Sequence, residues 1–463
     1  MSFWTVDRVS QALADEAWGA LPRGSTALGN VSTDTRSLHP GDIFVALRGE
    51  RFDAHDFLRE ALSRGAGLLV VADPARTVGA GVPVLAVHDT LAALGALGRF
   101  RRRAWSKPIV AIAGSNGKSS TKELVRAALG VAFDVHATEG NLNNFIGVPL
   151  TLLEIPDAAD VAVVEIGTNR PGEVDVLRSI VEPDVAVVTS IGEEHLEGLG
   201  DLAGVLAEES AVYRGVPLAI APASQPEVGT AARALAHRTV EAGLDQGDLR
   251  ADAWGLAADG AVWLRVGESQ VTLPLRGAHN ARNAMLALAV ADAFGIPRVR
   301  ALDGLSRMTP LPMRGAWEQL GTLSVINDAY NANPASAREA ITLLDGLDAT
   351  RPHVIVLGSM LELGEHTAAL HREIAERAVA SNCVLVAGVG EFVTAFADVG
   401  GRAPRVLTAP DLEQLWQLVQ PHLPANAIVM LKGSRGARLE RLMPRLRGFA
   451  GLDESGAGHA PHP

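Results

Sequence analysis

The chain contains a single cysteine, Cys383, and therefore cannot form an internal disulfide. One thiol in a long chain is typical of a reducing compartment. Apolar runs are short, such as VAVVEIG at 161–167, and none approaches the roughly 20 residues that cross a bilayer. The first ten residues lack the basic and then apolar layout of a signal peptide. These absences predict a soluble protein of the cytoplasm.

Lysine is also scarce, since the chain has four and arginine supplies nearly all the other positive charge. The net charge of -12 argues against a nucleic-acid partner, because phosphate contacts need clustered basic side chains. The negative net charge does not exclude anionic small substrates, because these need only a local positive site. Because arginine is the usual basic residue in this chain, the presence of a lysine is weak evidence that its position needs a compact ammonium group. The four are Lys107, Lys118, Lys122 and Lys432.

What the sequence does contain is a repeated alternation of short β-rich runs with longer amphipathic stretches. This pattern predicts an α/β fold with largely parallel sheets, and 463 residues predict several domains. Polar, glycine-punctuated alternation at 247–275 predicts a small antiparallel insertion, and the arginines at 99–103 predict a solvated basic face at a helix end. The predicted parts are three α/β domains at 1–104, 105–309 and 310–452, followed by a disordered tail at 453–463.

The strongest local signal is IVAIAGSNGKSSTKE at 109–123. A buried strand enters a loop of small residues and a helix follows, which predicts a nucleotide phosphate loop. Lys118 is expected to bridge the outer phosphates, and the Ser119 hydroxyl is expected to hold Mg²⁺. The usual spacing requires glycine where Ile112 stands, so this loop is a shortened variant. The predicted nucleotide-binding residues of the loop are Gly114, Ser115, Asn116, Gly117, Lys118, Ser119 and Ser120.

This loop resembles the form found in the Mur ligase family, GTNGK followed by serine or threonine. Further segments resemble motifs of the same family, in the family's order: STDTR at 32–36, NLNNFIGVP at 141–149, VVEIG at 163–167 and IGEEHLEGLG at 191–200. Three more segments match in the last third of the chain: NDAYNANPAS at 327–336, MLELGE at 360–365 and LKGSRG at 431–436. The resemblance therefore covers nearly the whole chain.

The resemblance implies three domains: an N-terminal UDP-sugar-binding domain, a central phosphate-loop ATPase and a C-terminal Rossmann-like domain. It implies an amide ligase that uses ATP and Mg²⁺ and proceeds through an acyl phosphate. The pair YNANP with MLELGE favours the family member that joins D-alanyl-D-alanine to UDP-N-acetylmuramoyl-tripeptide, and the enzyme is expected to be a monomer without nucleic-acid or membrane partners.

The resemblance also assigns roles residue by residue. Glu165 and His195 would bind magnesium, since both follow strand ends where open α/β sheets place ligands. The UDP-sugar and its peptide would meet Thr35, Arg36, Asp53, His55, Asn143 and Asn144. The nucleotide would also meet Asn280, Asp328, Asn331 and Asn333. Lys432 and Arg435 would serve the dipeptide carboxylate or the phosphates.

One position departs from the family. After HLEGLG the family usually carries a lysine that CO₂ converts to a carbamate, whereas this chain has Glu209. Glu209 supplies a carboxylate but is three bonds shorter than the carbamate, a deficit of roughly 3–4 Å. Our hypothesis is that Glu209, or its neighbour Glu208, reaches the metal through water or a shifted helix. Two alternatives remain: another amide ligase of the superfamily, such as a diamino-acid-adding or folylpolyglutamate enzyme, and a nucleotide-binding relic without turnover. The N-terminal STDTR segment disfavours the folate enzyme, and the retained Lys118, Ser119, Glu165 and His195 disfavour the relic.

Overall fold

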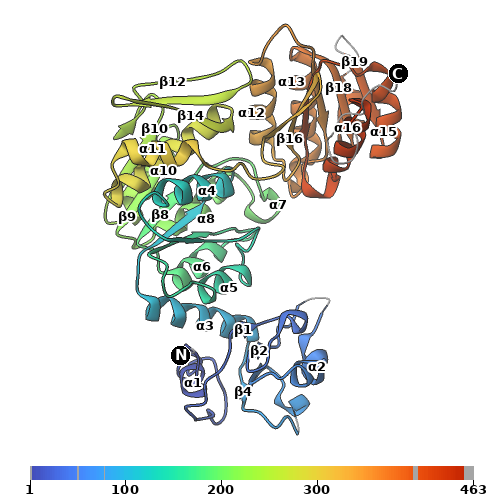
Figure 1. Cartoon of the computed structure of the whole chain (residues 1–463). Helices are drawn as coiled ribbons and strands as arrows, with labels where there is room; N and C mark the ends of the chain where they lie inside the picture. The colour runs from blue at the N-terminus through green and yellow to red at the C-terminus, as the bar shows by residue number, and fades with distance from the viewer. Residues whose placement is uncertain (1–2, 50–51, 78, 400–404, 453–463) are drawn as a thin grey trace, which may run out of the picture. The chain divides into compact units, whose positions relative to one another are not determined.

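The computed structural model describes residues 3–49, 52–77, 79–399 and 405–452, and it has the predicted α/β architecture (Figure 1). The tail predicted to be disordered, 453–463, lies outside the described residues. Contacts divide the chain into two compact units. The first is Met1–Ala111, Phe133–Thr168 and Glu173–Val185, and the second is Ile112–Ala132, Asn169–Gly172 and Ala186–Pro463. Within the described ranges, no helix is long and apolar enough to span a membrane.

The N-terminal part is a four-stranded parallel sheet in the order β1-β2-β3-β4. Its strands are β1 (Val31–Ser32), β2 (Ile43–Val45), β3 (Leu68–Val71) and β4 (Val84–Ala86), and its helices are α1 (Val6–Ala12), α2 (Leu58–Ser63) and α3 (Thr90–Trp105). Successive strand residues point to opposite faces. Ile43 and Val45 therefore belong to one core and Phe44 to the other. Strands β2, β3 and β4 coincide with the β-rich runs of the sequence at 42–47, 67–72 and 83–87, as the alternating pattern predicts.

The arginine cluster at the end of α3 corrects the sequence interpretation. Arg101 and Arg102 are buried, with 6% and 8% exposure. Arg101 donates to the carbonyl of Ile155 at 2.7 Å, and Arg102 donates to that of Val181 at 3.0 Å. The prediction of a solvated basic face is therefore wrong for these two residues. Their guanidinium groups donate to backbone carbonyls of segments that pack against the helix.

The central strands form a seven-stranded sheet in the order β11-β10-β9-β8-β5-β7-β6. They are β5 (Ile109–Ala113), β6 (Val135–Ala137), β7 (Val161–Glu165), β8 (Val185–Val188), β9 (Leu218–Pro222), β10 (Thr239–Gly243) and β11 (Leu249–Arg250). Every residue of β5 and β7 is buried, which explains their uninterrupted apolar runs. The helices here are α4 (Lys118–Leu129), α5 (Gly147–Leu153), α6 (Glu173–Val181), α7 (Leu196–Leu199), α8 (Leu202–Ser210), α9 (Pro226–Leu235), α10 (Ala278–Ala293) and α11 (Arg298–Ser306).

The predicted antiparallel insertion is confirmed. It consists of β12 (Ala253–Leu256), β13 (Ala261–Val266) and β14 (Ser269–Arg276), paired antiparallel in that order. The proline-bearing segment after α11 has no helix or strand before β15 begins at Ala316.

The C-terminal part is a six-stranded sheet in the order β15-β16-β20-β17-β18-β19, in which, within the described residues, only the β15–β16 pair is antiparallel. The strands are β15 (Ala316–Leu320), β16 (Leu323–Asp328), β17 (His353–Leu357), β18 (Cys383–Val389), β19 (Arg405–Ala409) and β20 (Ile428–Lys432). The helices are α12 (Pro334–Asp345), α13 (Thr367–Ala380), α14 (Phe392–Val399), α15 (Leu412–Val419) and α16 (Met443–Phe449). Strands β16, β17, β18 and β20 coincide with the β-rich runs of the sequence at 323–328, 353–358, 383–388 and 427–433, as the alternating pattern predicts.

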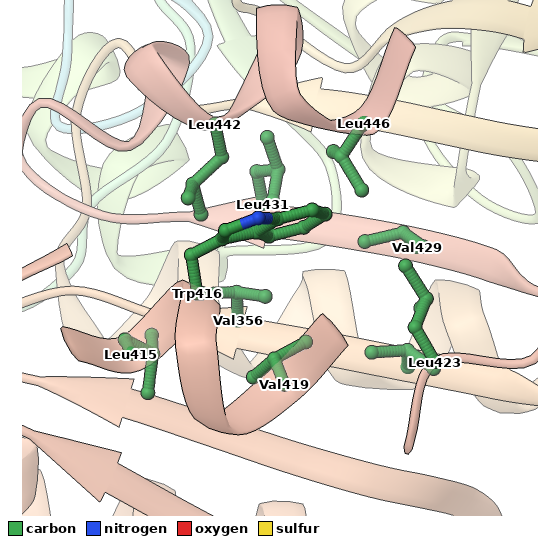
Figure 2. Close-up of a pocket in the computed structure, with 10 residues that line it drawn as sticks. Val356, Leu415, Trp416, Val419, Leu423, Val429, Leu431, Leu442 and Leu446 are labelled. Carbon is green, nitrogen blue, oxygen red and sulfur yellow. The ribbon is translucent and has the colours of Figure 1, made fainter. Parts of the chain in front are cut away.

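Helices cover both faces of this C-terminal sheet (Figure 1). Ile355 and Met430 face α12, α13 and α14, whereas Val356 and Val429 face α15 and α16. On the second face, Figure 2 shows the Trp416 ring reaching among Leu442, Leu446 and other apolar side chains. Only apolar residues line this pocket, so it belongs to the core and offers no chemical group for catalysis.

Candidate active site

The loop between β5 and α4 has the backbone shape that a phosphate loop requires. Gly114 has a φ of 118° and Gly117, the N-cap of α4, has a φ of 84°. Both values lie in the region that favours glycine. A Cβ at Gly114 would lie 2.4 Å from the Oγ1 of Thr189, so space as well as backbone conformation requires glycine there. The predicted strand, loop and helix are confirmed, and the start of α4 presents backbone N–H groups where an anion binds.

The segment after β8 holds this loop in place. The Thr189 hydroxyl donates to the carbonyl of Asn116 at 2.6 Å, and the Asn116 N–H donates to the Ser190 hydroxyl at 3.2 Å. The Gly192 N–H donates to the Ser115 hydroxyl at 2.9 Å. These three hydrogen bonds restrict the loop to one conformation, so the phosphate cradle is preformed.

Glu209 contacts the loop directly. It lies near the end of α8 with no exposed surface, and its Oε2 accepts the Gly114 N–H at 2.7 Å. Its Oε1 lies 4.0 Å from the Nζ of Lys118. The neighbouring Glu208 instead accepts the N–H of Gly172 at 2.6 Å. Of the two glutamates considered from the sequence, Glu209 is the one that the structure places against the phosphate loop.

Glu194 is a residue that the sequence did not single out. It is 5% exposed, and its Oε1 lies 3.7 Å from the Nζ of Lys118. Burial raises the pKa of the Glu194 carboxyl well above its usual value; Lys118 opposes this shift, while the nearby Glu209 reinforces it. The adjacent Glu193 pairs with Arg338 at 3.0 Å instead. Nothing in the sequence distinguishes the two acids, because only the path of the loop decides which side chain faces Lys118.

His195 follows Glu194 and has a left-handed backbone, with a φ of 51°. Its Nδ1 lies 2.5 Å from the Oε2 of Glu362. The pairing with His195 lowers the pKa of the Glu362 carboxyl, although burial opposes the shift. The other ring nitrogen, Nε2, lies 3.8 Å from the Oε2 of Glu194. The second unit therefore brings Lys118, Glu194, Glu209 and His195 together.

Two predicted residues meet in the first unit. Glu165, the last residue of β7, is 2% exposed, so it is not an ordinary solvent-facing residue at a strand end. The side-chain amide of Asn143 donates to its Oε1 at 2.8 Å. The Asn144 side chain accepts the N–H groups of Ile146 and Gly147 at 3.1 and 2.9 Å, which places it at the start of α5.

The predicted N-terminal residues form two local clusters. Thr35 is buried, whereas the exposed Arg36 side chain pairs with Asp34 at 2.6 Å. The Nδ1 of the buried His55 lies 2.6 Å from Asp53, and its Nε2 accepts the Ala72 N–H at 2.9 Å. Hydrogen bonds from His55, opposed by burial, lower the pKa of Asp53 to about 2. Both ring nitrogens of His55 thus have protein partners, and the pair shapes the loop.

In the C-terminal part, Lys432 is the centre of one cluster. Its Nζ lies 2.7 Å from the Oδ2 of Asp328 and donates to the carbonyl of Asn331 at 2.8 Å. The Asn333 side chain instead caps α12 by accepting the Ser336 N–H at 2.9 Å. Arg435 is largely exposed and contacts Met313 and Glu440.

The predicted Asn280 is buried at the start of α10, where its side-chain amide donates to the carbonyl of Arg276 at 2.8 Å. The residue of this helix that approaches the phosphate loop is Asn283, whose side-chain nitrogen would lie 2.8 Å from a Cβ at Gly117. Asn283, like Glu194, is therefore a residue near the loop that the sequence did not single out.

The site has the chemistry that Mg²⁺ prefers, although no three His, Cys, Asp or Glu side chains within the described ranges form a ready metal cage. Mg²⁺ in nucleotide enzymes commonly takes one or two carboxylates and completes its shell with phosphates and water. The Oε1 atoms of Glu194 and Glu209 are buried without a hydrogen-bond partner. Two such oxygens beside the phosphate loop fit a magnesium ion that accompanies a nucleotide.

A buried strand, a glycine-bearing loop and a helix whose first lysine faces buried acids define a phosphate-loop nucleotide-binding protein. The family matches extend this definition to the whole chain. Residues 28–102 match the family domain described as "Mur ligase family, catalytic domain", residues 112–291 match the Mur ligase middle domain, and residues 314–435 match the Mur ligase glutamate ligase domain. The chain belongs to the Mur ligase family.

Individual relatives agree with this assignment. The chain is 34% identical to the UDP-N-acetylmuramoyl-tripeptide–D-alanyl-D-alanine ligase of Bacillus subtilis, over 91% of this chain and 93% of the relative. The structure is similar to that of MurF from Acinetobacter baumannii, with a TM-score of 0.87, 32% identity and coverage of 96% and 99%. It is also similar to MurF ligase from Thermotoga maritima in complex with ADP, with a TM-score of 0.81, 25% identity and coverage of 91% and 97%.

Proposed function

We propose that this chain is a ligase that joins D-alanyl-D-alanine to UDP-N-acetylmuramoyl-tripeptide and converts ATP to ADP and phosphate. The observation that carries the proposal is the match to a protein named for this reaction, at 34% identity over 91% of the chain. Because the match extends through all three family domains, it includes the parts that would hold each substrate.

The reaction needs an activated carboxylate, because a carboxylate ion is a poor electrophile. The tripeptide carboxylate attacks the γ-phosphorus of ATP, ADP leaves, and an acyl phosphate forms. The amine of D-alanyl-D-alanine then attacks the acyl carbon, phosphate leaves, and an amide results. Lys118 and the N–H groups at the start of α4 would hold the phosphates during the first step.

Four residues would hold Mg²⁺ beside the nucleotide: Ser119, Glu165, His195 and Glu209. The bound ion offsets the repulsion between the phosphates and the attacking carboxylate. Glu209 supports this assignment because it is buried against Gly114 and keeps one oxygen without a hydrogen-bond partner. We keep our hypothesis that Glu209 supplies the carboxylate that relatives obtain from a modified lysine.

The other two substrates would be held by opposite ends of the chain. Arg36 carries an exposed guanidinium suited to a diphosphate, and Thr35 lies beside it, while Asp53 and His55 shape the neighbouring loop. Asn143 and Asn144 would line the path of the peptide. Toward the C-terminus, Lys432 and Arg435 would meet the dipeptide carboxylate or the phosphates. The remaining nucleotide contacts would come from Asn280, Asp328, Asn331 and Asn333.

The proposal is tested by phosphate release from the purified chain with ATP, Mg²⁺ and UDP-N-acetylmuramoyl-tripeptide. We expect release only when D-alanyl-D-alanine is added, and Lys118→Met serves as the inactive control. Release with a free diamino acid or with glutamate would instead assign the chain to another amide ligase of the superfamily. No release with any acceptor would favour a nucleotide-binding relic.

We also infer that the enzyme acts as a monomer in the cytoplasm. The single, buried Cys383 supports a reducing compartment. Light scattering coupled to gel filtration should give a mass near 48.5 kDa, and a mass of twice that value would contradict the monomer.

A further inference from the structure

We propose that Glu194 and Glu209, which both face Lys118, together hold a magnesium ion against the nucleotide phosphates. The inference rests on the proposed function for the presence of a nucleotide. It adds Glu194 to the predicted metal ligands, and it explains why two buried acids face one lysine.

The geometry consists of two buried carboxyl groups that converge on one ammonium. The Oε1 atoms of Glu194 and Glu209 lie 3.7 and 4.0 Å from the Nζ of Lys118. These same two oxygens are buried without a hydrogen-bond partner, in residues with 5% and 0% exposure. Native folds rarely leave buried acceptors incomplete unless an ion or water completes them. Both oxygens without a hydrogen-bond partner face Lys118, so one cation can bind both of them.

The second carboxylate oxygen of Glu209 fixes its direction. Because Oε2 accepts the Gly114 N–H at 2.7 Å, the carboxylate is tied to the backbone of the phosphate loop itself. Its Oε1 therefore keeps a defined position relative to the phosphate loop.

His195 lies beside Glu194, against the other oxygen of its carboxyl group. Its Nδ1 is engaged by Glu362 at 2.5 Å, which leaves Nε2 for a metal. That nitrogen lies 3.8 Å from the Oε2 of Glu194. Metal-binding histidines characteristically use one ring nitrogen for the metal and the other for a carboxylate or carbonyl. Glu362 supplies that carboxylate here.

Lys118 is the cation that the two carboxyl groups face. Its Nζ donates to the carbonyl of Gly114 at 2.5 Å, so the acids and the ammonium meet at the phosphate loop. A magnesium ion held by the two acids would lie near the phosphates that Lys118 would bind, since Mg²⁺ favours carboxylate and phosphate oxygens.

The test counts metal ions directly. Mn²⁺ replaces Mg²⁺, and free Mn²⁺ is measured by electron paramagnetic resonance with the full chain and saturating β,γ-imido ATP. We expect Glu194→Gln to weaken Mn²⁺ binding about 10- to 100-fold. The double variant Glu194→Gln/Glu209→Gln should bind one ion fewer per chain than the parent protein.

Two neighbouring acids serve as matched controls. Glu193 pairs with Arg338, and Glu208 accepts the Gly172 N–H, so Glu193→Gln and Glu208→Gln should bind Mn²⁺ as the parent does. Unchanged Mn²⁺ binding in Glu194→Gln overturns the inference. So does a lowered melting temperature with normal Mn²⁺ binding, because that result assigns Glu194 a purely structural role.

The two proposals fail in distinguishable ways. If the parent releases phosphate with D-alanyl-D-alanine while Glu194→Gln binds Mn²⁺ normally, the inference about Glu194 fails and the proposed function stands. If the variant loses the ion but the parent uses another acceptor, the substrate assignment fails and the metal site stands. If the parent binds no nucleotide, both fail.

Discussion

The Nδ1 atom of His195 lies 2.5 Å from the Oε2 of Glu362, and both residues have left-handed backbones, with φ values of 51° and 63°. The contact joins the segment after β8 to the segment after β17. A backbone bond from Glu197 N–H to the carbonyl of Glu362, at 3.2 Å, reinforces it. Left-handed conformations of non-glycine residues are costly, so surrounding contacts must maintain them.

Removal of the Glu362 carboxylate should slow the reaction without unfolding the protein. We expect Glu362→Ala to lower kcat about 10- to 100-fold, because the His195 ring loses the partner that orients it. The kcat of Glu362→Gln should fall less, since the amide oxygen of glutamine can accept a hydrogen bond from the Nδ1 of His195. Steady-state phosphate release measures both, and Glu365→Gln, with a side chain 90% exposed, is the control. Equal rates for Glu362→Ala and the control would show that this contact does not orient the ring.

Gly114→Ala should abolish nucleotide binding. The new Cβ would lie 2.4 Å from the Thr189 Oγ1 and 2.7 Å from its backbone nitrogen, so the loop must move away from Thr189. Gly215→Ala is the control, because Gly215 also has a positive φ, of 70°, but no atom within 4 Å of the added carbon. We expect it to cost about 1–2 kcal/mol of stability and to leave binding intact. Calorimetric titration with β,γ-imido ATP measures the difference, and normal binding by Gly114→Ala would contradict the preformed loop.

Arg102→Ala should destabilise the first unit strongly. Its guanidinium bonds the carbonyls of Val181 and Glu182 and lies 3.0 Å from the carboxylate of Asp184. Loss of a buried charge with several partners costs about 3–5 kcal/mol. The adjacent Arg103 is largely exposed and pairs with Glu182 at the surface, so Arg103→Ala should cost about 0–1 kcal/mol. Urea unfolding compares the two, and equal losses would contradict the buried role of Arg102.

Cys383 should report the unfolding of the C-terminal part. The thiol is buried, and burial raises its pKa to about 11. The reactive thiolate is therefore scarce at pH 8 and increases as the pH rises toward that value. We expect slow reaction with a disulfide reagent at pH 8 in the native protein and fast reaction in denaturing urea. Because the chain has no second cysteine, all the labelling comes from Cys383. Rapid native labelling would contradict the buried thiol.

Much of the fold follows from local pattern. The run IVAIA at 109–113 is apolar throughout, as a doubly covered parallel strand requires, and Gly114 and Gly117 mark the turn into α4. The sheet strands and the antiparallel insertion were predictable for the same reason: side-chain periodicity and turn residues act over a few neighbours. The phosphate loop, with Lys118 at the helix start, was predictable from these signals alone.

Only the tertiary structure decided which members of similar neighbouring pairs face the site. Glu193 and Glu194 are identical in chemistry, as are Glu208 and Glu209, yet one of each pair lies beside Lys118 and the other pairs elsewhere. Arg101 and Arg102 likewise became buried where the sequence predicted solvent. Burial and direction depend on which distant segments pack against a side chain, and those contacts arise from the folded topology, which short-range pattern does not contain.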